Sequence, residues 1–502
     1  MLATPTNTSP LTKPTRAKLR YEDITFTSKS QRQAVEEIIS ELTLASAALK
    51  NIKDHFILEL KKGLANDGET IAMVPVYVSG RLDGSETGSY LTMDIGGTYL
   101  RVVWVVLEGQ SQVKILQKKY KIDEHLKVGE AKALFVDEHS IIASFETEIE
   151  LGFTFSFPVL QTTINSGTLI AWTKGFNSLG VVDKDPAAFL QDAFRRRNVP
   201  VRVAALLNDT VGTLLAHAYR HSKTVIGLGL GTGSNGAYIE RVDRITKRRT
   251  VDETGAADTA EMVINMEFGA FDSERRVLPV TMFDNKIDRK SLASLYFINP
   301  GKQIFEKMIA GMYLGEIARN ILVHLIDRRL LLDGRCTKEM NTDWAFDTSY
   351  MSTIEADTTL ELKDTQLVLE CYLGLAIPES SATMATTLTD RQIVKLVVEL
   401  VGQRAARLSA AALAGILEHT RGVTWSEDDG GVDIGVDGSL YRYYPGFEAD
   451  IRGGLVDISQ LERDMGLAGI DVDVVRMGPS IDGSGVGAAL CALLASTASA
   501  LQ

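Results

Sequence analysis

The sequence predicts an α/β fold made of two related halves. Residues 90–107 and residues 224–240 each contain two apolar, β-rich runs joined by a glycine-rich turn, which is the pattern of a β-hairpin. The two segments share one design and therefore form a weak internal repeat. Segments with apolar residues at helical spacing lie before and after these strands. Such a mixture indicates an α/β architecture, in which ligands gather at the carboxyl ends of strands.

Further segments complete the expected order of elements. Residues 28–62 have helical spacing and begin at a serine cap, either Ser28 or Ser30. An apolar strand over 201–207 continues as a helical pattern, which places Asp209 at the N-terminus of a helix. Long core helices are expected over 301–331 and 389–419, and solvated surface loops over 240–261 and 426–433.

The composition predicts a soluble chain of two or three domains. With 502 residues, of which 24% are charged, the chain lies close to the globular average. No run approaches the ~18 consecutive apolar residues that cross a bilayer, so no membrane span is expected. Lys and Arg total 53 against 65 Asp and Glu, and the resulting net charge of −12 opposes binding to nucleic acid and to anionic membranes.

Cysteine usage and the N-terminal segment bear on the compartment. Cys336, Cys371 and Cys491 lie far apart without metal-ligand spacing, so a reducing, cytoplasmic location is expected, with neither disulfides nor a zinc site. Residues 1–27 lack the apolar core of a secretory signal and are expected to form a mobile tail. Their Ser, Thr and Pro with scattered Lys and Arg leave a weak transit peptide as the alternative.

Several kinds of chemistry are excluded by missing motifs. The sequence has no G-x-x-x-x-G-K-[ST] phosphate loop and no G-x-S-x-G nucleophile elbow. Its seven histidines form no H-E-x-x-H pair, and none lies beside a plausible Ser or Cys nucleophile. What remains is a set of glycine turns together with acidic and amide side chains.

The first glycine turn combines a carboxylate with exposed backbone amides. Asp94 ends an apolar run and is followed by Gly96, Gly97 and Thr98. Such a turn lets backbone N–H groups approach a phosphate, while the carboxylate holds Mg²⁺ directly or through water. Alone, this D-x-G-G-T turn is better explained as an ordinary hairpin turn in which glycine supplies a positive φ. A second turn of the same kind, Gly-Thr-Gly-Ser-Asn over 231–235, strengthens the phosphate-binding interpretation and suggests a polyphosphate held between two halves.

Polar residues also follow or interrupt apolar runs. Buried carboxylates and amides are costly unless they are paired, so such a set suggests a neutral, hydroxyl-rich ligand such as a sugar. Each residue taken separately is also explained as a helix cap or a satisfied core group, and for Asn208 an N-cap is as good an explanation as ligand contact. The set comprises Ser156, Thr173, Lys174, Asn208, Asp209, Asn235, Glu267, Gln303 and Glu306.

These residues lie within a series of motifs that resembles a known family. In chain order the motifs are MDIGGTYLR, LGFTFSFPVLQTTINSGTLIAWTKGF, LLNDTVGT, GTGSNGAY, INMEFGAF, NPGKQIFEKMIAGMYLGE, GVDGSLY and DGSGVGAAL. From about Ser28 to the C-terminus the sequence resembles the eukaryotic hexokinases and glucokinases, most closely the fungal type of about this length.

The resemblance implies a two-lobed actin-like ATPase (ribonuclease H-like) fold with the sugar between the lobes. By this resemblance the small lobe comprises residues 85–207 and 482–502, and the large lobe comprises 28–84 and 208–481. The implied activity is transfer of a phosphoryl group from MgATP to a hexose, with glucose as the expected acceptor.

The same resemblance implies roles for individual residues. Asp209 would be the general base for the sugar's 6-hydroxyl, and Lys174 would stabilise charge near the transferred phosphoryl group. The sugar hydroxyls would be held by Ser156, Thr173, Lys174, Asn208, Asp209, Asn235, Glu267, Gln303 and Glu306. Asp94 would hold Mg²⁺ through water, and the nucleotide would be bound by Asp94, Gly96, Gly97, Thr98, Arg101, Thr232, Gly233, Gly438, Ser439, Gly483 and Ser484.

One residue departs from the family pattern and leaves two other functions open. Tyr99 stands where the first phosphate loop of the family has Asn. The alternatives are an N-acetylglucosamine kinase of the same type, or a catalytically weak sugar sensor with a regulatory protein partner. The presence of Asp209 and Lys174 favours the enzyme, whereas Tyr99 favours the sensor.

Overall fold

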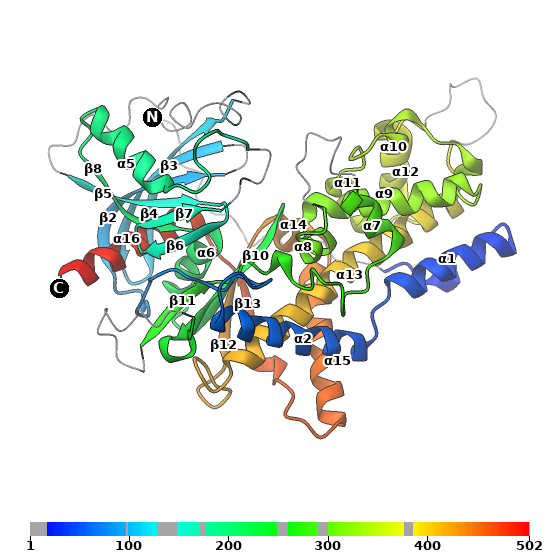
Figure 1. Ribbon diagram of the computed structural model, residues 1–502. Helices are drawn as coiled ribbons and strands as arrows, with labels where there is room; N and C mark the ends of the chain where they lie inside the picture. Colours follow the sequence, from blue (N-terminus) through cyan, green and yellow to red (C-terminus); the bar gives the residue numbers. More distant parts are fainter. Residues whose placement is uncertain are drawn as a thin grey trace.

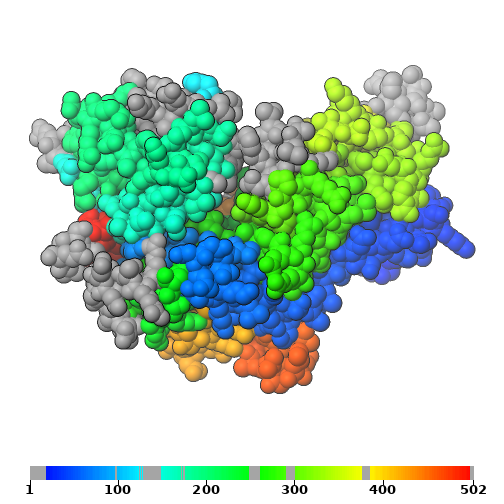
Figure 2. All heavy atoms as spheres, in the orientation of Figure 1, coloured from blue at the N-terminus to red at the C-terminus, as the bar shows by residue number. Residues whose placement is uncertain are grey.

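The chain folds around two β-sheets, as seen in a computed structural model (Figure 1). The structure describes residues 18–96, 99–123, 125, 127, 148–170, 172, 176–247, 260–289, 300–375 and 385–500. On the face drawn in Figure 2, the teal segments beside the first sheet and the green helical segments form separate masses. The α/β class expected from the sequence is confirmed.

The first sheet joins a three-stranded antiparallel meander to two parallel strands. Its order is β4-β3-β2-β5-β8, with β3 antiparallel to both β2 and β4, and with β5 parallel to both β2 and β8. The hairpin predicted over 90–107 is therefore confirmed. The strands are β2 (Thr87–Ile95), β3 (Tyr99–Gly109), β4 (Gln112–Lys121), β5 (Ile149–Phe155) and β8 (Val201–Leu207); beside them lie β6 (Val159–Thr163), β7 (Ser166–Leu169) and α5 (Pro186–Arg196).

The second sheet repeats this arrangement. In the order β1-β11-β10-β9-β12-β13, the strands β11, β10 and β9 are antiparallel, and β12 and β13 run parallel to β9. The weak internal repeat in the sequence thus corresponds to two sheets of one design. The strands are β1 (Val74–Pro75), β9 (Thr224–Leu230), β10 (Ser234–Arg241), β11 (Glu261–Asn265), β12 (Val432–Asp437) and β13 (Val475–Pro479).

Each sheet ends in a helix, and the two helices pack against each other. α6 (Asp209–Ala218) follows β8, and α16 (Gly483–Ala500) follows β13 and also packs on β2, β5 and β8. At their contact a Cβ atom on Gly212 would overlap the carbonyl oxygen of Gly483, and one on Gly487 would overlap backbone atoms of Gly212. The two helices therefore approach backbone to backbone.

The remaining helices build a region beside the second sheet, on the right of Figure 1. α13 is 33 residues long, is buried along most of its length, and begins with a capping box between Thr387 and Asp390. None of the described helices is long and apolar enough to cross a membrane. The helices are α1 (Lys29–Leu42), α2 (Ser46–Ala65), α7 (Met282–Arg289), α8 (Ile304–Ile309), α9 (Gly311–Asp327), α10 (Lys338–Asn341), α11 (Thr348–Ala356), α12 (Lys363–Leu367), α13 (Leu388–Thr420), α14 (Ser439–Tyr443) and α15 (Phe447–Asp464).

Some predicted boundaries are confirmed and others are wrong. Ser28 caps α1 by accepting a hydrogen bond from the Gln31 amide, as predicted. The single helix predicted over 301–331 is instead α8 and α9, because Ala310 is extended (ψ 143°) and lets the Gly311 amide bond to Gly231 in the β9–β10 turn. The loop predicted over 426–433 ends inside β12.

Residues that precede Ser28 already pack against the rest of the protein. Ile24 is buried, and the backbone amide of Leu19 donates to the Glu399 carboxylate on α13. Residues 18–27 thus contact the helical region.

Candidate active site

Asp209 stands at the junction of β8 and α6. The preceding residue, Asn208, caps α6: its Oδ1 accepts hydrogen bonds from the Thr210 amide (3.0 Å) and hydroxyl (2.9 Å). Both Asn208 and Asp209 are half-buried. None of the described residues forms a hydrogen bond or ion pair with the Asp209 carboxylate. The helix N-terminus, with its free backbone amides, favours a negative charge at this position.

A network of amide and carboxylate groups lies next to this junction. Asn235 on β10 donates from Nδ2 to Oδ1 of Asn265 (2.9 Å), to Oε1 of Glu267 (3.2 Å) and to Oδ1 of Asn208 (3.5 Å). Asn265 also donates to Glu267 (2.8 Å), and the Glu267 amide donates back to Asn235 (3.0 Å). The network brings together Asn208, Asn235 and Glu267, three of the predicted sugar residues.

Asn265 is the member of this network that the sequence analysis missed. It ends the buried strand β11, two residues before Glu267. A polar residue at the end of an apolar run was the signal used for the other positions, and Asn265 carries the same signal.

Gln303 and Glu306 approach the same place from the start of α8. Gln303 adopts the left-handed conformation (φ 56°) just before the helix. A Cβ atom on Gly269 would overlap Gln303 Oε1 and lie 3.0 Å from Glu306 Oε2, and one on Gly233 would lie 3.8 Å from that same oxygen. Glu306 thus lies between the loop after Glu267 and the β9–β10 turn.

The second glycine turn is fastened to a helix. The Gly231 amide donates to the Gly233 carbonyl, and the amides of Gly311 and Met312 at the start of α9 donate to the carbonyls of Gly231 (2.8 Å) and Thr232 (3.1 Å). Thr232 is exposed. The turn is therefore held in one conformation by α9.

The first glycine turn is described only in part. Asp94 lies at the end of β2, and Gly96 directly follows the strand at the tip of the β2–β3 hairpin, where its amide donates to the Tyr99 carbonyl (3.2 Å). Gly97 and Thr98 lie outside the described residues. The Tyr99 side chain is 49% exposed, so the phenol does not pack into the protein core.

Arg101 on β3 joins this turn to α16. Its guanidinium forms an ion pair with Asp482, just ahead of α16, and its Nε lies 3.8 Å from Asp94 Oδ2. Burial lowers the pKa of Arg101, but the carboxylates of Asp482, Asp94 and Asp437 outweigh it and raise the pKa overall. Arg101, predicted to bind nucleotide, is thus held by protein carboxylates.

The other predicted nucleotide residues also lie at helix starts. Gly438 (φ 118°) precedes α14, and a Cβ atom on Gly231 would lie 3.1 Å from its Cα, which brings this turn against the second phosphate turn. Ser439 begins α14 and is exposed. Gly483 and Ser484 begin α16, and the Thr154 hydroxyl donates to the Ser484 carbonyl (2.8 Å).

Ser156, one of the predicted sugar residues, belongs to the first sheet's side. Ser156 directly follows β5 and is buried; because β5 and β8 are parallel neighbours, its position lies at the same sheet edge as Asn208. Thr173 and Lys174 lie outside the described residues. The flanking Trp172 and Phe176 stack with ring centroids 5.4 Å apart.

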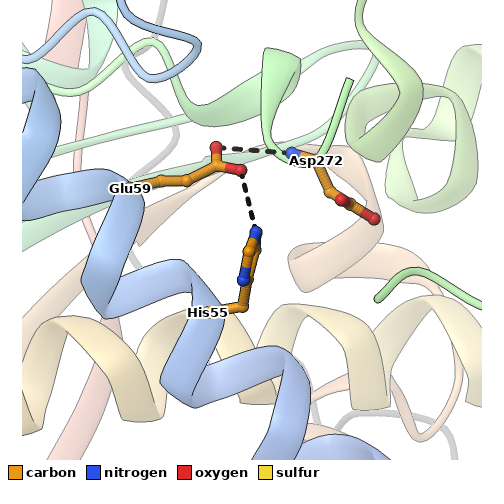
Figure 3. A group of neighbouring side chains, drawn as sticks. All are labelled: His55, Glu59 and Asp272. Carbon is orange, nitrogen blue, oxygen red and sulfur yellow. Dashed lines mark hydrogen bonds and ion pairs between the residues drawn. The ribbon is translucent and has the colours of Figure 1, made fainter. Parts of the chain in front are cut away.

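A cluster of titratable residues, His55, Glu59 and Asp272, joins α2 to the loop after Glu267 (Figure 3). His55 Nε2 lies 3.4 Å from Glu59 Oε1 on α2, and the Asp272 amide donates to Glu59 Oε2 (3.4 Å). Burial raises the pKa of Glu59 to about 7. The Asp272 carboxylate accepts the amides of residues 276, 277 and 278 at 2.6–3.0 Å. Asp272 is thereby committed to shaping its own loop.

The chain is similar to known proteins along most of its length. Two family models, both described as Hexokinase, match residues 34–219 and 225–494. A glucokinase of Aspergillus niger is 40% identical over 480 residues, which cover 88% of this chain and 92% of that protein. Hexokinase-1 of Saccharomyces cerevisiae is 35% identical and is aligned over 96% of both chains.

The fold comparison gives the same result. The structure of a hexokinase from Schistosoma mansoni complexed with glucose matches with a TM-score of 0.78 at 33% identity, covering 93% of this chain and 99% of that one. The two-lobed actin-like ATPase fold expected from the sequence is confirmed. Two family models that together span most of the chain, and relatives this similar over nearly its full length, show that the chain belongs to the hexokinase family.

Proposed function

We propose that this protein transfers the terminal phosphoryl group of MgATP to the 6-hydroxyl of a hexose, giving hexose 6-phosphate and ADP, with glucose as the preferred acceptor. The observation that carries the proposal is the Asp209 carboxylate at the start of α6, beside the hydrogen-bonded network of Asn208, Asn235 and Glu267. A relative with a TM-score of 0.78 was solved with glucose, which supports this acceptor.

The sugar site uses groups that both donate and accept hydrogen bonds. A hexose presents hydroxyls that do the same, so amides such as Asn208 and Asn235 and carboxylates such as Glu267 and Glu306 match it. We assign the same role to Gln303, to Ser156 and to Thr173. The amide of Asn235 is already oriented by its contacts with Asn265 and Glu267, so little ordering remains when the sugar binds.

Asp209 acts as the base in this proposal. Phosphoryl transfer needs in-line positioning and charge neutralisation more than covalent help from the protein. The Asp209 carboxylate, without a partner among the described residues, is available to accept the proton of the 6-hydroxyl as the new O–P bond forms. Lys174 is assigned to the charge that develops on the transferred group.

The nucleotide is assigned to the paired turns. We assign the phosphate oxygens to backbone amides of the turns at 96–98 and 231–233, and to residues 438–439 and 483–484, which follow the parallel strands β12 and β13 at the starts of α14 and α16. Asp94 offers the carboxylate oxygens that Mg²⁺ prefers, and the bound ion would neutralise phosphate charge. We place 85–207 and 482–502 in the small lobe and 28–84 and 208–481 in the large lobe, with the sugar between them.

The test is an ADP-release assay with MgATP and, separately, glucose, fructose, mannose and N-acetylglucosamine. The Asp209→Ala variant serves as the blank. Turnover with glucose or mannose that the variant loses supports the proposal.

Two other outcomes would replace it. Turnover with N-acetylglucosamine alone identifies a hexosamine kinase. Sugar binding by calorimetry without turnover identifies a sensor, for which Tyr99 at the phosphate turn would be the first residue to revert. We also infer that closure around the sugar excludes water and completes the site, and a high ATPase rate without sugar would contradict this inference.

A further inference from the structure

We propose that Asp288, a buried carboxylate outside the sugar-contacting set, is a positioning residue that fixes both loops of the sugar site, the one carrying Glu267 and the one carrying Gln303 and Glu306. The inference rests on the proposed function, because it takes these three side chains as the ones that hold the sugar. Asp288 lies on α7 and is 7% exposed.

The Asp288 carboxylate collects groups from both loops. Its Oδ1 accepts the Lys307 Nζ (2.6 Å) and the Gly301 amide (2.9 Å), and its Oδ2 accepts a guanidinium nitrogen of Arg275 (2.8 Å). Gly301 lies two residues before Gln303, and Lys307 directly follows Glu306. Arg275 belongs to the loop that begins at Glu267. One side chain therefore ties together segments that are 26 to 32 residues apart in sequence.

The helix that carries Asp288 is itself fixed to the core. One turn earlier on the same face, the Asp284 carboxylate accepts two hydrogen bonds from the buried Arg404 guanidinium on α13, at 2.7 and 2.9 Å. Asp284 also accepts the amide and hydroxyl of Thr281 (2.7 Å each). α7 is thus a rigid support with two carboxylates, of which one fastens it to α13 and the other holds the loops.

Both loops need such support because their backbones are strained. Glu267 (φ 58°), Asp272 (φ 53°), Arg275 (φ 57°) and Gln303 (φ 56°) all adopt the left-handed conformation, although none is glycine. Side-chain-bearing residues keep this conformation only where the surrounding structure holds it. Two of the four, Glu267 and Gln303, are themselves assigned to the sugar.

The charge of Asp288 matters as well as its hydrogen bonds. Lys307 is 4% exposed; burial lowers its pKa, and Asp288 is the foremost group that raises it again, followed by Glu306. If Asp288 loses its charge, the buried ammonium is left with the Glu306 carboxylate as its neighbour of opposite sign. Glu306 would then be drawn to Lys307 and away from the sugar.

The test compares substitutions on α7 by steady-state kinetics. Asp288→Asn is expected to raise the KM for glucose at least tenfold and to leave the KM for ATP within twofold. The double variant Asp288→Asn/Lys307→Gln, which also removes the cation that Asp288 balances, is expected to recover part of that loss. Arg275→Met removes the hydrogen bond between Arg275 and Asp288 at a partly exposed site and is expected to raise the glucose KM about threefold. This variant replaces Asp288→Asn in the test if Asp288→Asn does not fold.

Two controls on the same helix separate positioning from stability. Lys286→Gln changes a charge on α7 that has no hydrogen-bond or ion-pair partner among the described residues of either loop. Asp284→Asn weakens the α7–α13 attachment and the contact with Thr281, but leaves the Asp288 contacts with Gly301, Lys307 and Arg275 in place. Asp284→Asn is expected to lower the melting temperature while the glucose KM stays within twofold. Equal increases in glucose KM for Asp284→Asn and Asp288→Asn would overturn the positioning role, because general loosening would explain both.

A further variant tells failure of this inference from failure of the proposed site. If Glu306→Gln raises the glucose KM and Asp288→Asn does not, the sugar site stands and Asp288 is not a positioning residue. If Glu306→Gln leaves glucose binding unchanged, the assigned sugar site is wrong and the inference falls with it.

Discussion

The starts of α6 and α16 occupy the same place in the two halves of the molecule, yet the acidic residues there, Asp209 and Asp482, have different partners. Each helix follows the last parallel strand of its sheet, β8 or β13. Asp209 at the start of α6 has no partner among the described residues, whereas Asp482 ahead of α16 is paired with Arg101 from β3.

The difference indicates how one duplicated frame supports two tasks. The Asp209 carboxylate has no cation beside it in the part of the chain that the structure describes and is available to accept a proton. The Asp482 carboxylate is held in place by its ion pair with Arg101. The two glycine turns also differ in how they contact the rest of the protein. The turn at 231–233 is bonded to the start of α9, while at the tip of the first hairpin Tyr99 is half exposed.

The largest expected effect comes from neutralising the two acids in turn. Asp209→Asn should lower kcat by about 10²- to 10⁴-fold, since it removes the proposed base, and should leave glucose binding within a fewfold. Asp482→Asn should change kcat less than tenfold and act mainly on the KM for ATP. Steady-state kinetics with calorimetric sugar binding would check both, and equal losses in kcat would end the distinction between the halves.

The next effect concerns the backbone contact between α6 and α16. Gly487→Ala places a methyl group where backbone atoms of Gly212 already lie, so we expect a loss of about 3 kcal/mol in the free energy of unfolding. Gly453→Ala on α15 is the matched control, because its added methyl meets no atom within 4 Å and should stabilise the helix by up to ~1 kcal/mol. Denaturant unfolding measures both. If Gly487→Ala were neutral, the helices would not be in backbone contact.

A pH effect distinguishes α6 further. His217 is 5% exposed; burial, followed by the charge of His221 stacked 4.5 Å away, lowers its pKa to about 4, with Arg220 and Asp433 acting in opposite directions. The unfolded chain binds this proton near pH 6.5, so stability is full above that pH and falls as the pH drops toward 4.

This loss should amount to about 2 kcal/mol between pH 7 and pH 5. His217→Gln should flatten the dependence, whereas His221→Gln, at an exposed position, should leave most of it. Chemical denaturation at each pH is the measurement. A wild-type stability that is unchanged from pH 7 to pH 5 would contradict a buried neutral His217.

The smallest expected effect is at the first turn. Tyr99→Asn should change the KM for ATP two- to fivefold and leave the glucose KM unchanged, because Tyr99 adjoins the turn assigned to phosphate. Tyr99→Phe keeps the ring and serves as the control for the hydroxyl. If Tyr99→Asn leaves both constants unchanged, the residue is only a strand residue at the tip of its hairpin.

The sequence predicted features that depend on neighbouring residues. The hairpins, the strand over 201–207, the Ser28 cap and the junction at Asp209 follow from local spacing and are confirmed. The sugar network was predicted in part, because Asn235 and Glu267 carry a local signal, and the same signal at Asn265 went unused.

Features that depend on distant pairing were not predicted. Arg101 and Asp482 are 381 residues apart, and nothing near either residue predicts the ion pair between them. The break at Ala310 is likewise set from outside, since it serves a hydrogen bond to Gly231. The attachment of both sugar loops to Asp288 belongs to the same class.

The close approach of α6 and α16 also has a mechanical consequence. Helices usually interlock because side-chain ridges of one fill grooves of the other. Where Gly212 faces Gly483 and Gly487 there are no ridges, so the contact is smooth and offers little resistance to a small rotation of one helix over the other. A small rotation between α6 and α16 at this contact therefore disturbs few side chains.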